Sequence, residues 1–247
     1  MAARRARAAA AAARWNIERT LTPLGLSVVM PTLNESATIQ AALQALMPLA
    51  ARGAQILVAD GGSLDATAQL ARAGGVQVIH APRGRARQMN AGAQQASGHI
   101  LVFLHADTRL PPNADNLIAQ ALADGHQVWG RFDVQIAGQS RMLCVIAMLM
   151  NLRSRRTGIA TGDQAMFMTR AAFDAVGGFP DQPLMEDIEM SARLRKLSRP
   201  ACLRARVVTS GRRWETRGVW RTVLLMWRLR FAYWRGAAPE RLAALYR

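Results

Sequence analysis

The chain has 247 residues, of which 51% are hydrophobic, so it can build the core of one large α/β domain and cannot be wholly disordered. Its net charge of +16 is concentrated at the ends, with +4 on residues 1–25, +10 on residues 199–247 and only +2 on residues 26–198. This distribution excludes a strongly basic body built for specific nucleic-acid binding and indicates appendages that contact anionic lipid or another polyanion.

The N-terminal segment 1–25 consists mainly of alanine and arginine and has no apolar core of the kind that a signal peptide needs. We expect a disordered or loosely helical leader whose removal changes stability and activity little. The two cysteines, Cys144 and Cys202, show no metal-site or disulfide spacing, which fits a reducing cytoplasm. No apolar run reaches the ~18–20 residues of a membrane-spanning helix.

From residue 26 onward, short apolar runs alternate with helical patterns. The predicted strands lie at 26–30, 55–59, 76–80, 100–104, 127–136, 165–168 and 203–209, and the last of them could run antiparallel. The predicted helices lie at 35–49, 65–73, 84–96 and 139–156, with another opening at 186. This alternation predicts an α/β fold with a mostly parallel, Rossmann-like sheet and helices on both faces.

The first four predicted strands are each followed by polar residues, where open α/β sheets bind ligands. Asp60 precedes Gly61-Gly62, and its carboxylate could accept a hydrogen bond from a base N–H or a ribose hydroxyl. A turn into the next helix, capped by Ser63 or Asp65, explains the same residues equally well.

Two further strand-end clusters have a chemical and a plainer interpretation. His105 and Asp107 alternate along the fourth strand and could hold a divalent cation against a diphosphate, although a strand-end aspartate is also a common turn residue. Arg85 and Arg87 open a helix, where guanidinium groups suit phosphate oxygens. A solvated basic turn is the alternative for these arginines.

The stretch 161–197 contains the candidate general base. After Gly177-Gly178 breaks the chain, Glu186, Asp187 and Glu189 open a helix. Acidic residues in a first helical turn are stabilised by the helix dipole, so they could simply mark the helix start. The alternative is that they supply a carboxylate base at the mouth of a pocket.

Taken in order, these segments resemble glycosyltransferase family 2 on the GT-A fold. The resemblance covers roughly residues 26–197 and rests on SVVMPTLNES, VADGGSLDAT, NAGAQQASGHILVFLHADT and GFPDQPLMEDIEMSARLR. The chain departs from the family at the first acidic position of the metal motif, which is His105 here. The extra arginines of the 84–88 stretch resemble a bacterial subgroup of poorly defined substrate.

The resemblance implies an inverting, metal-assisted transfer of a sugar from a nucleotide-sugar to an acceptor hydroxyl or phosphate. It implies Asp187 as the base and Asp107 as the main ligand of Mg²⁺ or Mn²⁺, with His105 as a weak second ligand or a neighbour. Donor-binding positions implied in the same way are Pro31, Asn34, Glu35, Asp60, Asp65, Arg87, Asn90, Asp163 and Glu186.

The basic tail at 211–247 follows a predicted catalytic domain at 26–210. A helix over 216–235 would carry Arg217, Arg221, Arg228 and Arg235 in one stripe, opposite a stripe of apolar residues that includes Trp227. Such a helix suits an anionic bilayer surface, or it packs on the domain's own core. The first case predicts a cytoplasmic enzyme, peripheral at the inner face of the cell membrane, with a lipid-linked or small-molecule acceptor.

Two rival functions remain open at this point. Nucleotidyl transfer would need a glycine-rich loop with a lysine near residues 26–36, and neither is present. A nucleotide-binding or polyanion-binding protein with basic tails and no transferase activity is the alternative outside enzymes.

Overall fold

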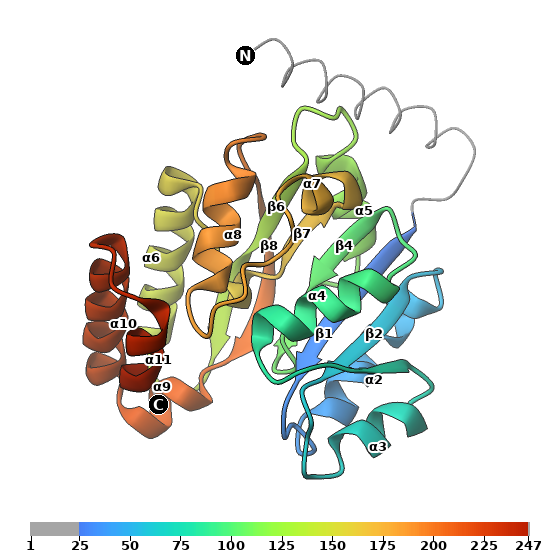
Figure 1. The fold of residues 1–247 in the computed structure, drawn as a ribbon, viewed down its shortest axis with the longest axis horizontal. Helices are drawn as coiled ribbons and strands as arrows, with labels where there is room; N and C mark the ends of the chain where they lie inside the picture. The colour runs from blue at the N-terminus through green and yellow to red at the C-terminus, as the bar shows by residue number, and fades with distance from the viewer. Residues whose placement is uncertain (1–24, 247) are drawn as a thin grey trace.

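The computed structural model describes residues 25–246, so all but the last residue of the predicted leader 1–25, and the expected effect of its removal, lie outside the described residues. The described chain forms an eight-stranded sheet in the order β3-β2-β1-β4-β7-β6-β8-β5, with helices on both faces (Figure 1). The strands are β1 (Leu26–Thr32), β2 (Gln55–Asp60), β3 (Gln77–His80), β4 (Ile100–Phe103), β5 (Thr108–Arg109), β6 (Trp129–Ala137), β7 (Met166–Thr169) and β8 (Ala201–Ser210).

The helices carry the connections between these strands. They are α2 (Ile39–Ala50), α3 (Thr67–Ala73), α4 (Arg85–Gln95), α5 (Ala114–Ala121), α6 (Met142–Thr157), α7 (Arg170–Ala175), α8 (Glu186–Leu194), α9 (Arg212–Arg217), α10 (Val219–Trp234) and α11 (Pro239–Tyr246), with a short 3₁₀ turn, η1 (Gly162–Gln164). The predicted α/β fold with a helical tail is therefore confirmed. The short β5, α5 and α11 had no predicted counterpart.

Most of the sheet is parallel, as the alternation predicts. β1 pairs in parallel with β2 and β4, and β2 pairs in parallel with β3. β7 runs antiparallel to β4 and β6. β8 runs parallel to β6 along most of its length and antiparallel to the two-residue β5. The expectation of an antiparallel late strand is therefore correct only for the short pairing with β5.

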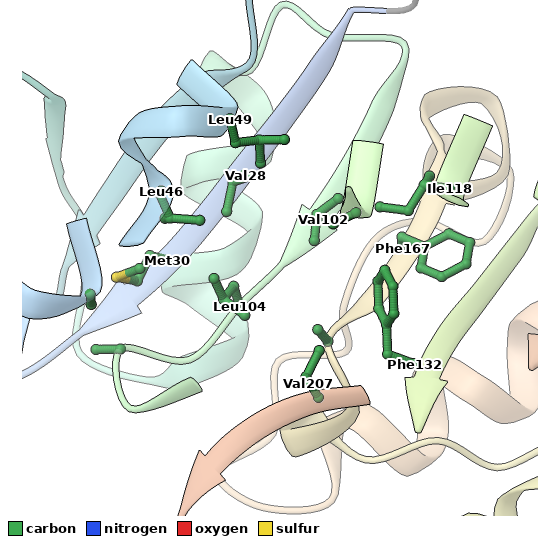
Figure 2. Packing of buried hydrophobic residues seen from close by; sticks show 14 of the residues in the cluster. Val28, Met30, Leu46, Leu49, Val102, Leu104, Ile118, Phe132, Phe167 and Val207 are labelled. Atoms are coloured by element: carbon green, nitrogen blue, oxygen red, sulfur yellow. The ribbon is translucent and has the colours of Figure 1, made fainter. Parts of the chain in front are cut away.

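Two apolar clusters cover the two faces of the sheet. On one face, Val28 and Met30 of β1 pack with Leu46 and Leu49 of α2 in a cluster that extends to α5 and α6 (Figure 2). On the other face, strand residues pack with α4, α7 and α8. Because both faces are covered, the central strands are apolar at nearly every position, which explains why they were predictable as continuous apolar runs.

The C-terminal region differs from the predicted single helix over 216–235. Gly218 has a φ of 83°, a conformation that glycine adopts without steric cost, and it separates α9 from α10. On its inner side, α10 buries Leu229 against Leu184 and Met185, in a cluster that also includes Leu242 of α11. No helix within residues 25–246 is long and apolar enough to cross a membrane.

Candidate active site

The loops after β1 and β2 are joined by hydrogen bonds that leave little freedom at this edge of the sheet. Asn34 has a φ of 55°; its N–H donates to Ser63 Oγ at 2.9 Å and its Oδ1 accepts from Leu64 N at 2.9 Å. Glu35 N donates to Thr67 Oγ1 at 2.7 Å. Pro31 lies partly buried near the end of β1. The structure thus brings Pro31, Asn34 and Glu35 together with the loop that follows Asp60.

Asp60 and Asp65 both accept hydrogen bonds from their own turns. Buried Asp60 accepts from Gly62 N at 3.1 Å and Ser63 N at 3.0 Å. Asp65 accepts from Thr67 N at 3.0 Å and Ser36 N at 3.0 Å. The Thr67 hydroxyl, followed by the Ser36 contact, holds the pKa of Asp65 well below its usual value. The turn interpretation accounts for the contacts of Asp60 and for the Thr67 contacts of Asp65, while the Ser36 contact ties Asp65 to the loop after β1.

Helix α4 crosses this edge and holds two strands and a loop. Gln88 is buried, and its Nε2 donates to the carbonyls of Thr32 at 2.6 Å and Ala59 at 2.9 Å, joining the ends of β1 and β2. Asn90 Nδ2 donates to the Phe179 carbonyl at 2.8 Å and its Oδ1 accepts from Phe179 N at 2.9 Å. Gln88 was not among the predicted site residues. A polar residue on the apolar side of a predicted helix was the signal that could have identified it.

The arginines at the start of α4 have different surroundings. Arg87 is exposed and its Nε lies 2.7 Å from Asp181 Oδ1, so together with Asn90 it fastens the 179–181 loop to α4. Arg85 Nη1 lies 3.1 Å from Oε1 of the buried Glu186 in the first turn of α8. The ion pair between Arg85 and Glu186 joins the starts of two helices that are 101 residues apart in sequence.

A pocket opens between these two helix starts. It is lined by Arg85, Met89, Phe103, His105, Gly162, Met166, Phe179, Glu186 and Asp187. Of the predicted site residues, His105, Glu186 and Asp187 therefore share one pocket. Asp60, Asp65, Arg87, Asn90 and Asp107 do not line it.

Asp187 has the most distinctive environment of the pocket carboxylates. Its Oδ2 accepts from Gly162 N at 2.9 Å and its Oδ1 accepts from Ile188 N at 2.7 Å. Burial, and then the negative charge of Glu186, raises the pKa of Asp187 to about 6. A carboxylate that is fixed in position and titrates near neutral pH has the properties of a general base.

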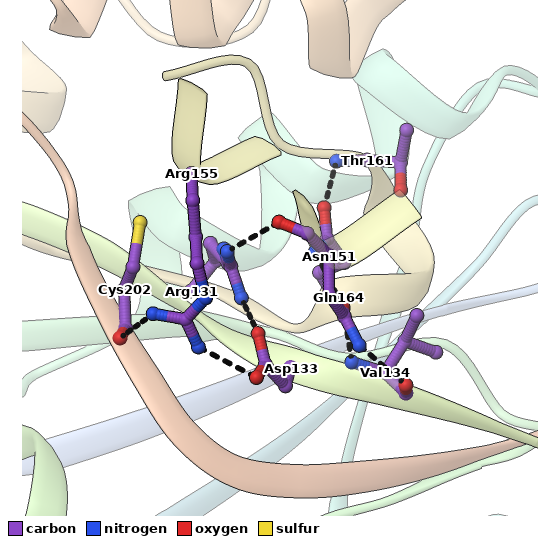
Figure 3. A network of polar contacts seen from close by, with 8 residues as sticks. All are labelled: Arg131, Asp133, Val134, Asn151, Arg155, Thr161, Gln164 and Cys202. Atoms are coloured by element: carbon purple, nitrogen blue, oxygen red, sulfur yellow. Dashed lines mark hydrogen bonds and ion pairs between the residues drawn. The ribbon is translucent and has the colours of Figure 1, made fainter. Parts of the chain in front are cut away.

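The turn that holds Asp187 is itself held by a polar network between β6 and α6 (Figure 3). The side-chain amide of Asn151 on α6 makes the two backbone hydrogen bonds that a neighbouring strand would otherwise make with Val134. It accepts from the Val134 N–H at 2.8 Å and donates to the Val134 carbonyl at 2.9 Å. Gln164 Nε2 then donates to Asn151 Oδ1 at 3.3 Å, and its Oε1 accepts from Thr161 N at 3.2 Å. This chain of contacts fixes the 161–164 turn, and therefore the Gly162 N–H that Asp187 needs.

His105 and Asp163 meet on the other side of the same turn. His105 Nδ1 lies 3.4 Å from Asp163 Oδ1, and the ring packs so closely on Gly162 that an added Cβ would come within 2.4 Å of it. Burial opposes ionisation of Asp163, but the His105 ring and the charge of Arg85 hold the pKa of Asp163 below its usual value. Asp163 is thus a charged partner of His105 at the pocket.

The alternation argument for His105 and Asp107 does not hold, because β4 ends at Phe103 and the two residues lie in a turn closed by Thr108 N donating to His105 O at 3.0 Å. The Asp107 carboxylate accepts from the Thr108 hydroxyl at 3.3 Å and is only partly buried. Residues 25–246 contain no group of three or more His, Cys, Asp or Glu side chains arranged to hold a metal ion. The donor set therefore fits only a cation site that substrate oxygens complete, as Mg²⁺ sites at phosphates commonly are.

The C-terminal segment also reaches this region. The Arg213 guanidinium lies over the Tyr246 ring at 3.8 Å from its centroid and also hydrogen-bonds the Tyr246 hydroxyl. Burial raises the pKa of Tyr246, and the negative charges of Asp163 and Asp187 act in the same direction. Sequence patterns gave no signal for this pair, because it depends on how α9 and α11 fold back on each other.

Comparisons with known proteins identify the family of the chain. Residues 27–174 match the family model described as Glycosyl transferase family 2. The chain is similar to glucosyl-3-phosphoglycerate synthase from Mycobacterium tuberculosis in complex with Mn²⁺, uridine-diphosphate and glucosyl-3-phosphoglycerate, at 21% identity and a TM-score of 0.57 over 75% of this chain and 70% of that chain. It is also similar to S. aureus TarS 1–349 in complex with UDP, at 18% identity and a TM-score of 0.60 over 75% of this chain and 60% of that chain.

A search among curated proteins found no match. At these low identities, the likeness to the two solved structures establishes the fold only. The family match is stronger evidence, because residues 27–174 make up more than half of the 247-residue chain. This protein therefore belongs to glycosyl transferase family 2 and is a glycosyltransferase.

Proposed function

We propose that this enzyme transfers a sugar from a nucleotide-sugar donor to an acceptor hydroxyl or phosphate, with inversion at the anomeric carbon and Asp187 as the general base. The observation that carries the proposal is the Asp187 carboxylate, which lines the pocket, is held by the Gly162 N–H at 2.9 Å and has its pKa raised to about 6. Both solved structures named above contain uridine-diphosphate, which supports a nucleotide-linked donor.

In the proposed reaction with a hydroxyl acceptor, Asp187 takes the hydroxyl proton as the oxygen forms a bond to the anomeric carbon; an ionised phosphate acceptor would attack without this proton transfer. The bond from that carbon to the diphosphate oxygen breaks at the same time, on the opposite face of the sugar, so the configuration inverts. Arg85, ion-paired to Glu186 beside the base, lies where a guanidinium group can contact the sugar or the departing phosphate.

The donor's nucleotide is proposed to lie along the joined loops after β1 and β2. Pro31, Asn34, Glu35, Asp60 and Asp65 would shape that site, partly by their own side chains and partly by holding the loops. Arg87 and Asn90 would act by holding the 179–181 loop at the edge of the pocket.

A divalent cation is proposed at Asp107, with His105 as a weaker ligand or a neighbour held by Asp163. When bound, Mg²⁺ or Mn²⁺ would neutralise the charge that develops on the leaving diphosphate. The Mn²⁺ in the mycobacterial synthase structure supports a divalent metal.

The raised pKa of Asp187 predicts the pH dependence of the reaction. Because only the ionised carboxylate can accept a proton, kcat/KM should be level at high pH and fall about tenfold per pH unit below the pKa of about 6. The measurement is kcat/KM across a pH series with donor and acceptor whose own groups do not titrate in that range. An acid limb near pH 4 instead would assign the base to a carboxylate without a raised pKa.

The donor can be identified by thermal stabilisation. A ligand that binds the folded protein raises its melting temperature, by an amount that corresponds to about 2.7 kcal/mol at a concentration of 100 times the Kd. A panel of nucleotide-sugars, each with and without Mn²⁺, should give one nucleotide class that stabilises the protein more strongly with the metal. Stabilisation by heparin but by no nucleotide-sugar would favour the alternative of a polyanion-binding protein without transferase activity.

The acceptor is proposed to be lipid-linked or a small molecule. We also propose that the enzyme works in the cytoplasm as a peripheral protein at the inner face of the cell membrane, with the 26–210 body catalytic and the 211–247 tail as its contact with the membrane. The basic charge of that tail supports this placement.

A further inference from the structure

Helix α10 has apolar side chains on two sides, and only one side is used by the fold. Its inner side packs Leu229 on Leu184 and Met185, while Val219 and Val223 pack on the main core. Its outer side exposes five large apolar residues, with exposed fractions of 65% for Trp220, 70% for Trp227 and 78% for Trp234. The five outer residues are Trp220, Leu224, Trp227, Phe231 and Trp234, which we call the outer stripe.

The spacing of the outer stripe makes it continuous. Its members follow one another at steps of four, three, four and three residues, which keeps them on one side of an α-helix over its whole length. Phe231 and Trp234 contact each other, with ring centroids 6.0 Å apart. A continuous row of exposed aromatic residues on this scale is rare on a surface that meets only water.

A row of arginines borders the outer stripe. Arg221, Arg228 and Arg235 each follow a tryptophan of the stripe by one residue and are exposed, so they lie about 100° around the helix from it. The Arg235 guanidinium lies 5.9 Å from the centroid of the Phe231 ring, which shows how closely charge and aromatic surface adjoin. The helix itself contains no acidic residue.

We propose that the outer stripe of α10 docks on an anionic membrane surface, with the three arginines at the level of the lipid headgroups. Tryptophan suits the boundary between headgroups and acyl chains, because its ring is apolar and its N–H can remain hydrated. The charge decides between this partner and a second copy of the chain, since two facing stripes would bring six arginines together with no acidic residue of α10 between them.

The docking helix is also the support of the catalytic segment. Leu184 and Met185, against which its inner side packs, directly precede Glu186 and Asp187. Docking would therefore place the segment that leads into Asp187 next to the membrane-bound helix. The proposal itself rests on the outer face of α10 and stands whether or not Asp187 is the base.

Vesicle binding of the full-length protein tests the proposal. Vesicles of equimolar phosphatidylcholine and phosphatidylglycerol should co-sediment with the protein at low salt, and phosphatidylcholine vesicles should bind far less. Replacing Arg221, Arg228 and Arg235 together by Gln should weaken binding about a hundredfold, from about 1 kcal/mol for each arginine near the surface. Higher ionic strength should weaken binding of the wild type in the same direction.

Two further variants separate the apolar contribution from charge and from folding. The first variant replaces Trp220, Trp227 and Trp234 together by Ser and should abolish vesicle binding. Its melting temperature should stay within a few degrees of that of the wild type, because these side chains are exposed. The matched control replaces the exposed Arg109, Arg199 and Arg204 by Gln, which removes the same charge outside α10 and should leave most of the binding.

Three results would overturn the proposal. The first is that the wild-type protein does not bind the anionic vesicles at low salt, and the second is that the tryptophan triple variant still binds them. The third is that light scattering shows a wild-type dimer that binds no vesicles and that becomes a monomer in the tryptophan triple variant. Binding to an oligonucleotide in place of vesicles would likewise assign the face to another polyanion.

Discussion

Replacing Asp187 by Asn should lower kcat by about 10²–10⁴-fold while leaving the affinity for the donor close to that of the wild type. The asparagine keeps the shape of the side chain, and its single oxygen can still accept one of the Gly162 and Ile188 N–H groups, but it cannot take a proton from the acceptor. Single-turnover rates normalised to folded protein measure the loss. A wild-type rate in this variant would place the base elsewhere, with Asp163 and Glu186 the next candidates.

The structure also shows which neighbouring carboxylate is the suitable control for Asp187→Asn. Glu186 is adjacent in sequence but is buried and ion-paired to Arg85, so Glu186→Gln would disturb the pocket itself. Glu189 lies on the same helix and pairs along the helix surface, with its Oε1 2.9 Å from Arg193 Nε. Glu189→Gln should therefore leave the rate nearly unchanged and serve as the matched control.

Stability distinguishes the base from a simple helix-start residue at the same position. If Asp187 only interacted favourably with the helix dipole, neutralising it would lower the stability of the protein by a few tenths to about 1 kcal/mol. Asp187 has its pKa raised by burial and by Glu186, so its ionised form is disfavoured in the folded protein at neutral pH. Asp187→Asn removes this cost of ionisation but also loses one of the two backbone hydrogen bonds to the carboxylate. The melting temperature of the variant, compared with that of the wild type, should therefore be more favourable at pH 7 than well below pH 6.

The fold was predictable because the central strands are covered on both faces. The runs 26–30 and 55–59 are each apolar at all but one position, and each ends at a polar loop of the ligand-binding edge. The short β5 was not predictable, since its two residues become a strand only by pairing with β8, about 100 residues later. The break at Gly218 was overlooked because a single glycine inside an apolar pattern is often tolerated.

The candidate site likewise has residues that were predictable from local sequence patterns and residues that were not. The acidic helix start at Asp187 was predictable because it follows a glycine-rich break, and its role as the base was implied only by the family resemblance and stays a prediction. Gln88 and the Arg213–Tyr246 pair were missed, since their contacts join distant parts of the chain that no local pattern relates. The outer face of α10 was also assigned differently. The sequence pattern grouped Val223 and Met226 with Trp227 on one apolar side, which either a membrane or the core could cover. In the structure Val223 and Met226 pack inward, and the exposed row is built from the tryptophans with Leu224 and Phe231.

Replacing Asp107 by Ala should remove the metal dependence of nucleotide binding, and with it most of the activity. The expectation rests on a donor set of only two side chains, in which a carboxylate is the stronger partner for a hard cation such as Mg²⁺. His105→Ala should have a smaller effect, because His105 already has Asp163 as a partner at 3.4 Å and a neutral imidazole contributes less to a hard cation. Asp174→Ala, at an exposed position on α7, is the matched control.

Calorimetry of uridine-diphosphate binding, with and without Mn²⁺, measures this effect directly and needs no turnover. The wild type and Asp174→Ala should bind more tightly with the metal, while Asp107→Ala should bind with one weak affinity in both conditions. Because the Asp107 carboxylate accepts only a 3.3 Å contact from Thr108 among the described residues, its removal should leave the fold intact. An Asp107→Ala protein whose affinity still rises with Mn²⁺ as in the wild type would show that other groups hold the metal, with His105 and Asp163 the first to examine.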